Sequence, residues 1–120
     1  MKLTYTTDAN NNKSFNFPSE AIEIINANRK RFALRSVEKD LEPFKIFNLL
    51  RQILKTCEFS EQRVKEQTEN GTKTAFDFGA IEKNEFVDAF NENCGSRSMN
   101  ELCLDNADDA WKVLTLISED

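Results

Sequence analysis

The residues best suited to catalysis in this 120-residue chain are its carboxylates, because the sequence contains no histidine. Four acids recur along one predicted helical region: Glu82, Glu85, Asp88 and Glu92. Paired carboxylates perform acid–base or glycosidic chemistry when their environments shift their pKa values apart. A row of carboxylates on an exposed helix is more often a solvated face. Histidine, the commonest general base, is also missing from the sequence. We therefore predict no catalytic residues and a protein that is not an enzyme.

A second acidic cluster, Asp105, Asp108 and Asp109, offers oxygen ligands for calcium. In a calcium-binding loop beginning at Asp105, position six would be Ala110 instead of glycine, and position twelve would be Leu116 instead of a bidentate acid. The spacing therefore fails as a calcium loop. Helix capping is the better interpretation, with Asp105 as the predicted cap of the helix that follows.

The three cysteines, Cys57, Cys94 and Cys103, contain no CxxC pair, and there is no histidine to complete a zinc site. An odd number of cysteines favours reduced thiols in a cytosolic protein. The first residues lack the apolar stretch of a signal peptide, and no run approaches the ~18 apolar residues of a membrane span. We predict a cytoplasmic protein without a metal, a cofactor or membrane contact.

The charge of the chain is sorted along its length. Residues 1–57 carry ten Lys/Arg and six Asp/Glu, a net of about +4, whereas residues 58–120 carry six and fifteen, a net of about −9. Together the halves give the overall net charge of −5. Solubility alone does not require such segregation, so it favours an electrostatic partner over small-molecule chemistry.

The acidic half predicts a non-enzymatic protein-binding module that covers a basic surface of its target, because complementary potentials speed encounter and suppress wrong partners. A small acidic inhibitor of the immunity, antitoxin or phage-inhibitor kind fits, with a nuclease or another nucleic-acid-binding protein as the basic partner. The competing interpretation is that the acids serve solubility. The predicted contacts lie on helices at 81–93 and 105–117: Glu82, Glu85, Asp88, Glu92, Asp108 and Asp109.

The basic half leaves further alternatives open. Its strongest cluster is Arg29, Lys30, Arg31 and Arg35, and phosphate contacts need clustered cations, so the chain could be a nucleic-acid-associated subunit. A sequence pI of about 4.9 and the lack of an aromatic-interleaved recognition motif weigh against this function. The cluster could instead meet the acidic half within the monomer or across a homodimer. A phage or virion assembly factor is the other alternative, and it predicts self-association.

The elements that must position these residues form one α+β domain over residues 1–120. Alternating segments flanked by turn residues predict a small antiparallel sheet with strands near 2–7, 13–17 and 74–78. Four to five helices pack against it, and residues 43–57 have the clearest helical periodicity. A polar helix is predicted from Ser60 to about Thr68. If the strands are merely extended segments, a mostly α-helical fold is the alternative.

Overall fold

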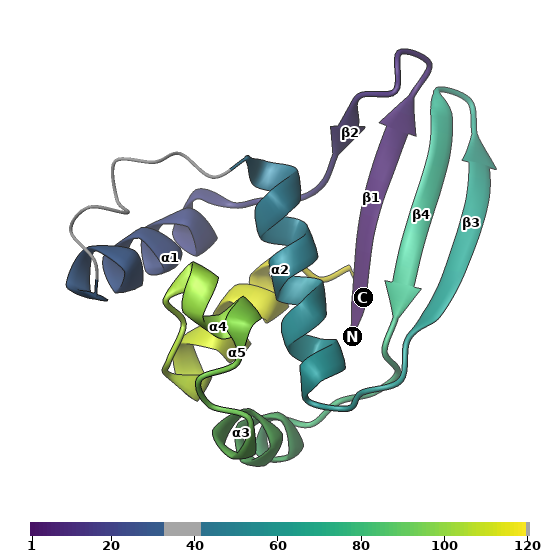
Figure 1. The fold of residues 1–120 in the computed structure, drawn as a ribbon. Helices are drawn as coiled ribbons and strands as arrows, with labels where there is room; N and C mark the ends of the chain where they lie inside the picture. Colours follow the sequence, from purple (N-terminus) through teal and green to yellow (C-terminus); the bar gives the residue numbers. More distant parts are fainter. Residues whose placement is uncertain (33–41, 120) are drawn as a thin grey trace.

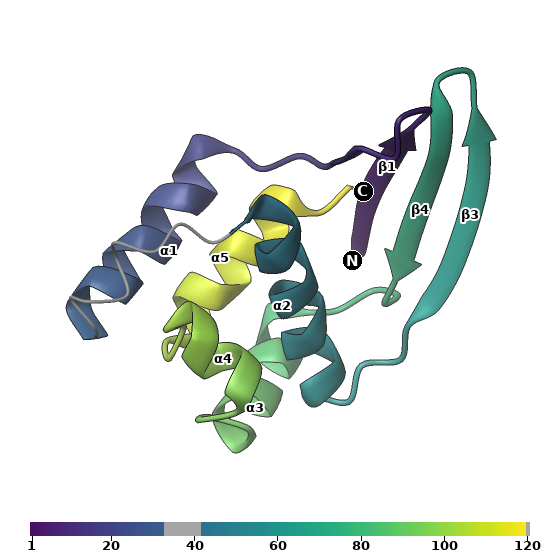
Figure 2. The same cartoon turned by 45° about the horizontal axis from the view of Figure 1, so that its top comes forward.

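The computed structural model describes residues 1–32 and 42–119, and it confirms the α+β class. The strands are β1 (Lys2–Asp8), β2 (Lys13–Ser14), β3 (Gln62–Thr68) and β4 (Gly71–Asp77). The helices are α1 (Ser19–Phe32), α2 (Pro43–Thr56), α3 (Lys83–Glu92), α4 (Arg97–Leu102) and α5 (Ala107–Ile117). The antiparallel sheet has the order β2-β1-β4-β3, and the helices form a second layer against one of its faces (Figure 1, Figure 2).

Asp8 closes the first hairpin, where the sequence has a turn-prone Asp–Asn run. Its carboxylate accepts hydrogen bonds from the backbone N–H groups of Asn10 and Asn12 at 2.8 and 2.9 Å. Asn11 between them has a φ of 64°, a backbone angle that asparagine tolerates better than most residues. The hairpin therefore follows from local side-chain chemistry.

The strand predicted over 13–17 is shorter in the structure, because β2 ends after two residues. The chain then turns toward the helices. Phe15 packs its ring against that of Phe47 in α2, with the centroids 5.0 Å apart, and Phe17 stacks on Phe15 at 5.3 Å. The apolar alternation that favoured a longer strand therefore serves aromatic packing instead.

The segment 60–68 contains a strand, and the predicted polar helix there is wrong. β3 pairs with β4 in antiparallel register along its whole length, so long-range pairing outweighs the weak local preference of this polar segment. β4 also begins three residues earlier than the predicted strand 74–78. It opens with Gly71, whose φ is 149°, and a Cβ atom there would lie 1.9 Å from the Thr7 carbonyl oxygen.

Side chains of the sheet alternate between a face that meets the helices and a polar outer face. Leu3, Tyr5 and Phe76 are buried on the helix side. The Phe47 ring of α2 lies 5.6 Å from Tyr5 and 6.2 Å from Phe76, measured between centroids. These contacts attach α2 to the centre of the sheet.

α2 is the central helix, as its apolar periodicity predicts, and it ends one residue before the predicted boundary. Pro43 lies in its first turn, where a missing N–H costs no hydrogen bond. Its buried side chains are Ile46, Phe47, Leu50, Ile53 and Leu54. The helix therefore supplies much of the core between the sheet and the other helices.

α5 begins with a different cap from the predicted one. Asn106, not Asp105, occupies the N-cap position, and its side-chain oxygen accepts hydrogen bonds from the N–H groups of Asp108 and Asp109 at 2.8 and 3.2 Å. A cap residue must reach the amides two and three positions ahead of it. The helix starts at Ala107, which places Asn106 at that distance.

Candidate functional site

The outer side of α3 carries a row of four exposed acids, which we call the α3 acidic stripe: Glu82, Glu85, Asp88 and Glu92. Phe86 and Phe90 lie on the opposite side of the helix and are fully buried, so packing turns the acids outward. Among the described residues, no salt bridge involves any of the four. The structure therefore brings these predicted contact residues together on one face.

The other two predicted contacts have partners within the molecule. Asp108 forms an ion pair with Lys83 at 3.3 Å, with both side chains more than half exposed. Asp109 is half-buried and accepts a hydrogen bond from the Asn28 side chain at 3.2 Å. Asp108 therefore joins α5 to the start of α3, and Asp109 joins α5 to α1.

The predicted basic cluster is not a uniform exposed surface. Arg29 is only 6% exposed, whereas Lys30 is exposed. The side chain of Arg31, and Arg35 as a whole, lie outside the described residues. The end of α1 that carries Arg29 and Lys30 lies away from α2 in both views (Figure 1, Figure 2). Arg29 does not present the solvent-facing cation that a phosphate contact needs.

A second group of cations lies between α2 and β3. Arg51 donates two hydrogen bonds to the Glu61 carboxylate, at 2.5 and 2.6 Å, and its guanidinium carbon lies 4.1 Å from the Phe76 ring centroid. The hydrogen bond from Arg51, assisted by the charges of Arg51, Lys55 and Arg63, lowers the pKa of Glu61 despite its partial burial. A carboxylate thus lies at the centre of several cations.

Sequence reasoning missed this group because it assigned residues 60–68 to a helix. In a helix Glu61 and Arg63 would point in different directions, whereas in an extended segment they share one face. The sequence feature that favours a strand here is the alternation of charged and apolar side chains at Arg63, Val64 and Lys65. Alternation predicts a strand best when its apolar residues are buried on one face. Val64 is 49% exposed, so the apolar position in this alternation does not mark a buried face.

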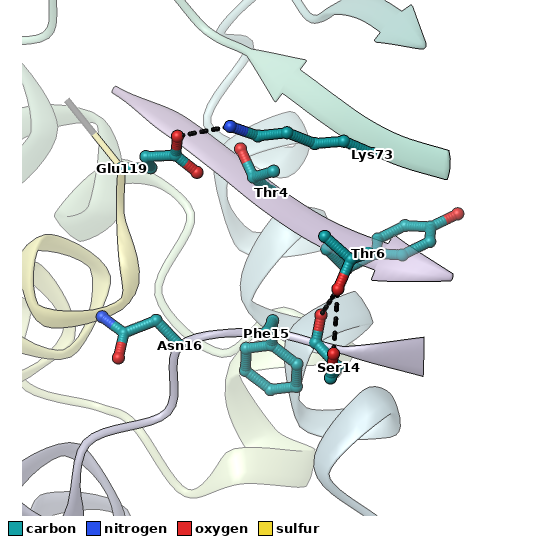
Figure 3. Close-up of a pocket in the computed structure, with 8 residues that line it drawn as sticks. Thr4, Thr6, Ser14, Phe15, Asn16, Lys73 and Glu119 are labelled. Atoms are coloured by element: carbon teal, nitrogen blue, oxygen red, sulfur yellow. Dashed lines mark hydrogen bonds and ion pairs between the residues drawn. The ribbon is translucent and has the colours of Figure 1, made fainter. Parts of the chain in front are cut away.

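An open polar cavity of about 310 Å³ lies beside β1 (Figure 3). Its walls are Thr4, Tyr5, Thr6, Ser14, Phe15, Asn16, Lys73 and Glu119. The Thr4 hydroxyl is buried beside Glu119 and helps to lower the pKa of that carboxylate, after the larger effect of Lys73. Lys73 of the central strand β4 and Glu119 form an ion pair at 2.6 Å that passes over β1 (Figure 3). The cavity therefore offers hydroxyl groups and a charged pair to a polar ligand.

The ion pair in this cavity keeps both its members charged. The hydrogen bond to Glu119 raises the pKa of Lys73, and the hydrogen bond from Lys73 lowers the pKa of Glu119. A lysine base or nucleophile needs a lowered pKa, and a carboxylic acid that donates a proton needs a raised one. The pKa of Lys73 is raised and that of Glu119 is lowered, which is the reverse of what proton transfer needs. This pair is therefore suited to binding and not to proton transfer.

The three cysteines differ in burial, and Cys57 is the buried one. Burial raises the pKa of Cys57 to about 11, which disfavours the reactive thiolate. Cys94 is exposed and Cys103 is half-buried. Within residues 1–32 and 42–119, no group of three or more Cys, Asp or Glu side chains is arranged to hold a metal ion.

Comparison of the chain with protein-family models, with curated proteins and with solved structures finds no match. In the part of the chain that the structure describes, no helix is long and apolar enough to cross a membrane.

Proposed function

We propose that this protein is a non-enzymatic binding domain whose α3 acidic stripe contacts a basic surface on a protein partner. The observation that carries the proposal is the joint exposure of Glu82, Glu85, Asp88 and Glu92 on one side of a helix. The buried Phe86 and Phe90 anchor the opposite side. Packing therefore holds the four carboxylates in a defined array without using any of them.

The spacing of the stripe makes it an electrostatic unit. Glu82 and Glu92 are ten positions apart, which is about 15 Å along an α-helix. The Debye length at physiological ionic strength is about 8 Å, so neighbouring charges in the row reinforce one another. Lys83 is the single Lys or Arg between residues 74 and 96, and it pairs with Asp108. A basic partner therefore meets an almost purely negative face.

A more specific proposal is that binding inhibits the partner by covering its basic surface. A protein that acts on nucleic acid needs its basic surface free to contact phosphates. A row of carboxylates on a small domain occupies that surface and raises the association rate through steering. This makes an inhibitor of the immunity, antitoxin or phage-inhibitor kind the function that best uses the stripe.

The test compares two variants of equal net charge. The first neutralises the stripe through Glu82→Gln, Glu85→Gln, Asp88→Asn and Glu92→Gln. The matched control neutralises four exposed acids elsewhere: Glu23→Gln, Glu58→Gln, Glu66→Gln and Glu69→Gln. Tagged wild type and both variants are used to capture proteins from nuclease-treated native lysate, and the association rate of the purified partner is measured from 50 to 300 mM salt.

We expect wild type and the control to capture the same basic protein, with salt releasing it. The stripe variant should associate at least tenfold more slowly at low salt. If the partner is a nuclease, wild type and the control should inhibit it in proportion to binding. Capture that is equal for all three proteins, or association that is insensitive to salt, would contradict the proposal.

A further inference from the structure

The register of the sheet decides which of its charges share a face. Residues opposite one another on antiparallel strands point to the same side. On the helix side, the cross-strand rows are Leu3–Phe76–Arg63, Tyr5–Thr74–Lys65 and Thr7–Thr72–Gln67, with Lys13 opposite Thr7. None of these described positions is an acid. The strand acids Asp8, Glu66 and Asp77 all fall on the other face.

Side-chain contacts confirm this orientation. The Lys13 ammonium lies 4.4 Å from the Phe44 ring centroid and 5.7 Å from that of Tyr5, both on the helix side. The Arg63 guanidinium carbon lies 5.9 Å from the Phe76 ring centroid. Cations from both edges of the sheet thus point to the face that α2 covers only in part.

The uncovered part of this face is a continuous polar surface, which we call the inner rim: Thr7, Lys13, Arg63, Lys65, Gln67 and Thr72. The threonines are half-buried and the other four side chains are exposed. The hairpin ends of the sheet extend past the first turn of α2 (Figure 1). Given strand spacings of about 4.8 Å and a rise of about 3.3 Å per residue, the rim measures roughly 14 by 13 Å.

We infer that the inner rim binds the sugar–phosphate backbone of a nucleic-acid duplex, independently of base sequence. Lys, Arg, Thr and Gln side chains are the groups that proteins use for phosphate contacts. The first turn of α2 adds the positive end of a 14-residue helix beside Lys13, which contacts Phe44 in that turn. No salt bridge within the described residues occupies Lys13, Arg63 or Lys65.

Two observations favour a duplex backbone over other polyanionic partners. Tyr5 and Phe76 are buried, at 9% and 3% exposed. The half-buried Phe44 ring lies between the Lys13 ammonium and the Phe47 ring, so these rings offer no free face to the bases of a single strand. The rim also presents no apolar side chain, because Val64, the exposed apolar side chain of β3, points to the other face, so its contacts are limited to the charged and polar groups that a phosphate backbone uses.

The acidic stripe does not cancel the field of the rim. α3 lies at one end of the molecule and the hairpin turns lie at the other in both views (Figure 1, Figure 2). The longest extent of the molecule is 42 Å, several times the Debye length of about 10 Å at 0.1 M salt. The rim therefore acts separately from the proposed contact with a basic protein, and either function can hold without the other.

The test measures fluorescence anisotropy of a labelled 20-base-pair DNA of mixed sequence between 50 and 200 mM salt. The rim variant is Lys13→Gln with Lys65→Gln. The matched control is Lys2→Gln with Lys112→Gln, which removes the same charge from the outer sheet face and from α5. A third variant, Lys30→Gln, tests the end of α1. Circular dichroism checks that each variant is folded.

We expect wild type and the control to bind with the same affinity, and the rim variant to bind at least tenfold more weakly at 50 mM salt. The slope of log affinity against log salt should fall by about 1.8, because each lost phosphate contact removes about 0.9. Three results would overturn the inference: no binding by wild type at 100 µM protein, equal losses for rim and control variants, or equally tight binding of polyglutamate. Loss through Lys30→Gln alone would move the site to α1.

Discussion

Replacing Gly71 with alanine should test a close backbone approach between β1 and β4. A Cβ atom at Gly71 would lie 1.9 Å from the Thr7 carbonyl oxygen, and real contacts of this kind stay above 3.0 Å, so β1 and β4 must separate by about 1.1 Å. Gly79 also has a positive φ, 74°, but nothing lies within 4 Å of its Cβ position. The pair therefore compares a left-handed backbone angle in open space with a φ that is essentially restricted to glycine at a close backbone contact.

The magnitudes follow from these two geometries. At Gly79 alanine meets only the disfavoured angle, at about 1 kcal/mol. At Gly71 a φ of 149°, which is essentially restricted to glycine, costs alanine at least as much, and disruption of about two backbone hydrogen bonds at the hairpin end adds about 1 kcal/mol each, for a total of at least about 3 kcal/mol. With an unfolding entropy of about 2.1 cal/mol/K per residue, the expected losses in Tm are about 4 °C for Gly79→Ala and about 12 °C for Gly71→Ala.

Thermal unfolding followed by circular dichroism measures both shifts, and urea unfolding converts them to free energies. Because both substitutions add one methyl group at a positive φ, effects on the unfolded chain are alike and cancel in the comparison. Equal Tm losses for the two variants would refute the reasoning, since the collision with Thr7 would then cost nothing.

Two further substitutions test local interactions. Asn106→Ala should lower the free energy of unfolding by about 1 kcal/mol because it removes the cap of α5, whereas Asn106→Ser should restore most of the loss; equal stability of both variants in urea would reject the cap. Glu61→Gln should reduce the acid sensitivity of the fold. The pKa of Glu61 is lowered from about 4.5 by Arg51, so its stabilisation is present above that pH and is lost as the pH falls through the lowered value. Unfolding at pH 7 and at about pH 3 should show a gap between wild type and Glu61→Gln that shrinks in acid, and a constant gap would contradict this cause.

Elements with strong local signals were predictable from the sequence. α2 has five buried apolar residues that recur at three- and four-residue steps and a proline at its start, and its bounds agree within one residue. The first hairpin follows from the chemistry of Asp8. β3 was not predictable, because its residues are exposed throughout and its conformation depends on pairing with β4. The cap of α5 was misassigned by one residue, since both Asp105 and Asn106 are good capping residues and only the helix start decides between them.

The residues of a candidate surface could be predicted from the sequence where the surface lies on a single helix. The α3 acidic stripe needs only helical periodicity, and the sequence predicts all four of its residues. Arg29 shows where this reasoning ends: its position in a basic run suggested exposure, but the packing of α1 buries it. The predicted partner and the inhibitor function stay predictions.

The fold also changes the meaning of the charge segregation. Along the chain, Arg63 and Lys65 belong to the acidic half, and Lys13 belongs to the basic half. In space, strand pairing places all three on one face of the sheet, while the acids of the same strands face the other way. The net charge of a sequence half therefore does not describe a surface. What the structure separates is a helix with outward carboxylates at one end and, at the other, a sheet face whose strand residues include no acid and beside which Glu61 is bound by Arg51. The two proposed contacts can therefore be disrupted independently.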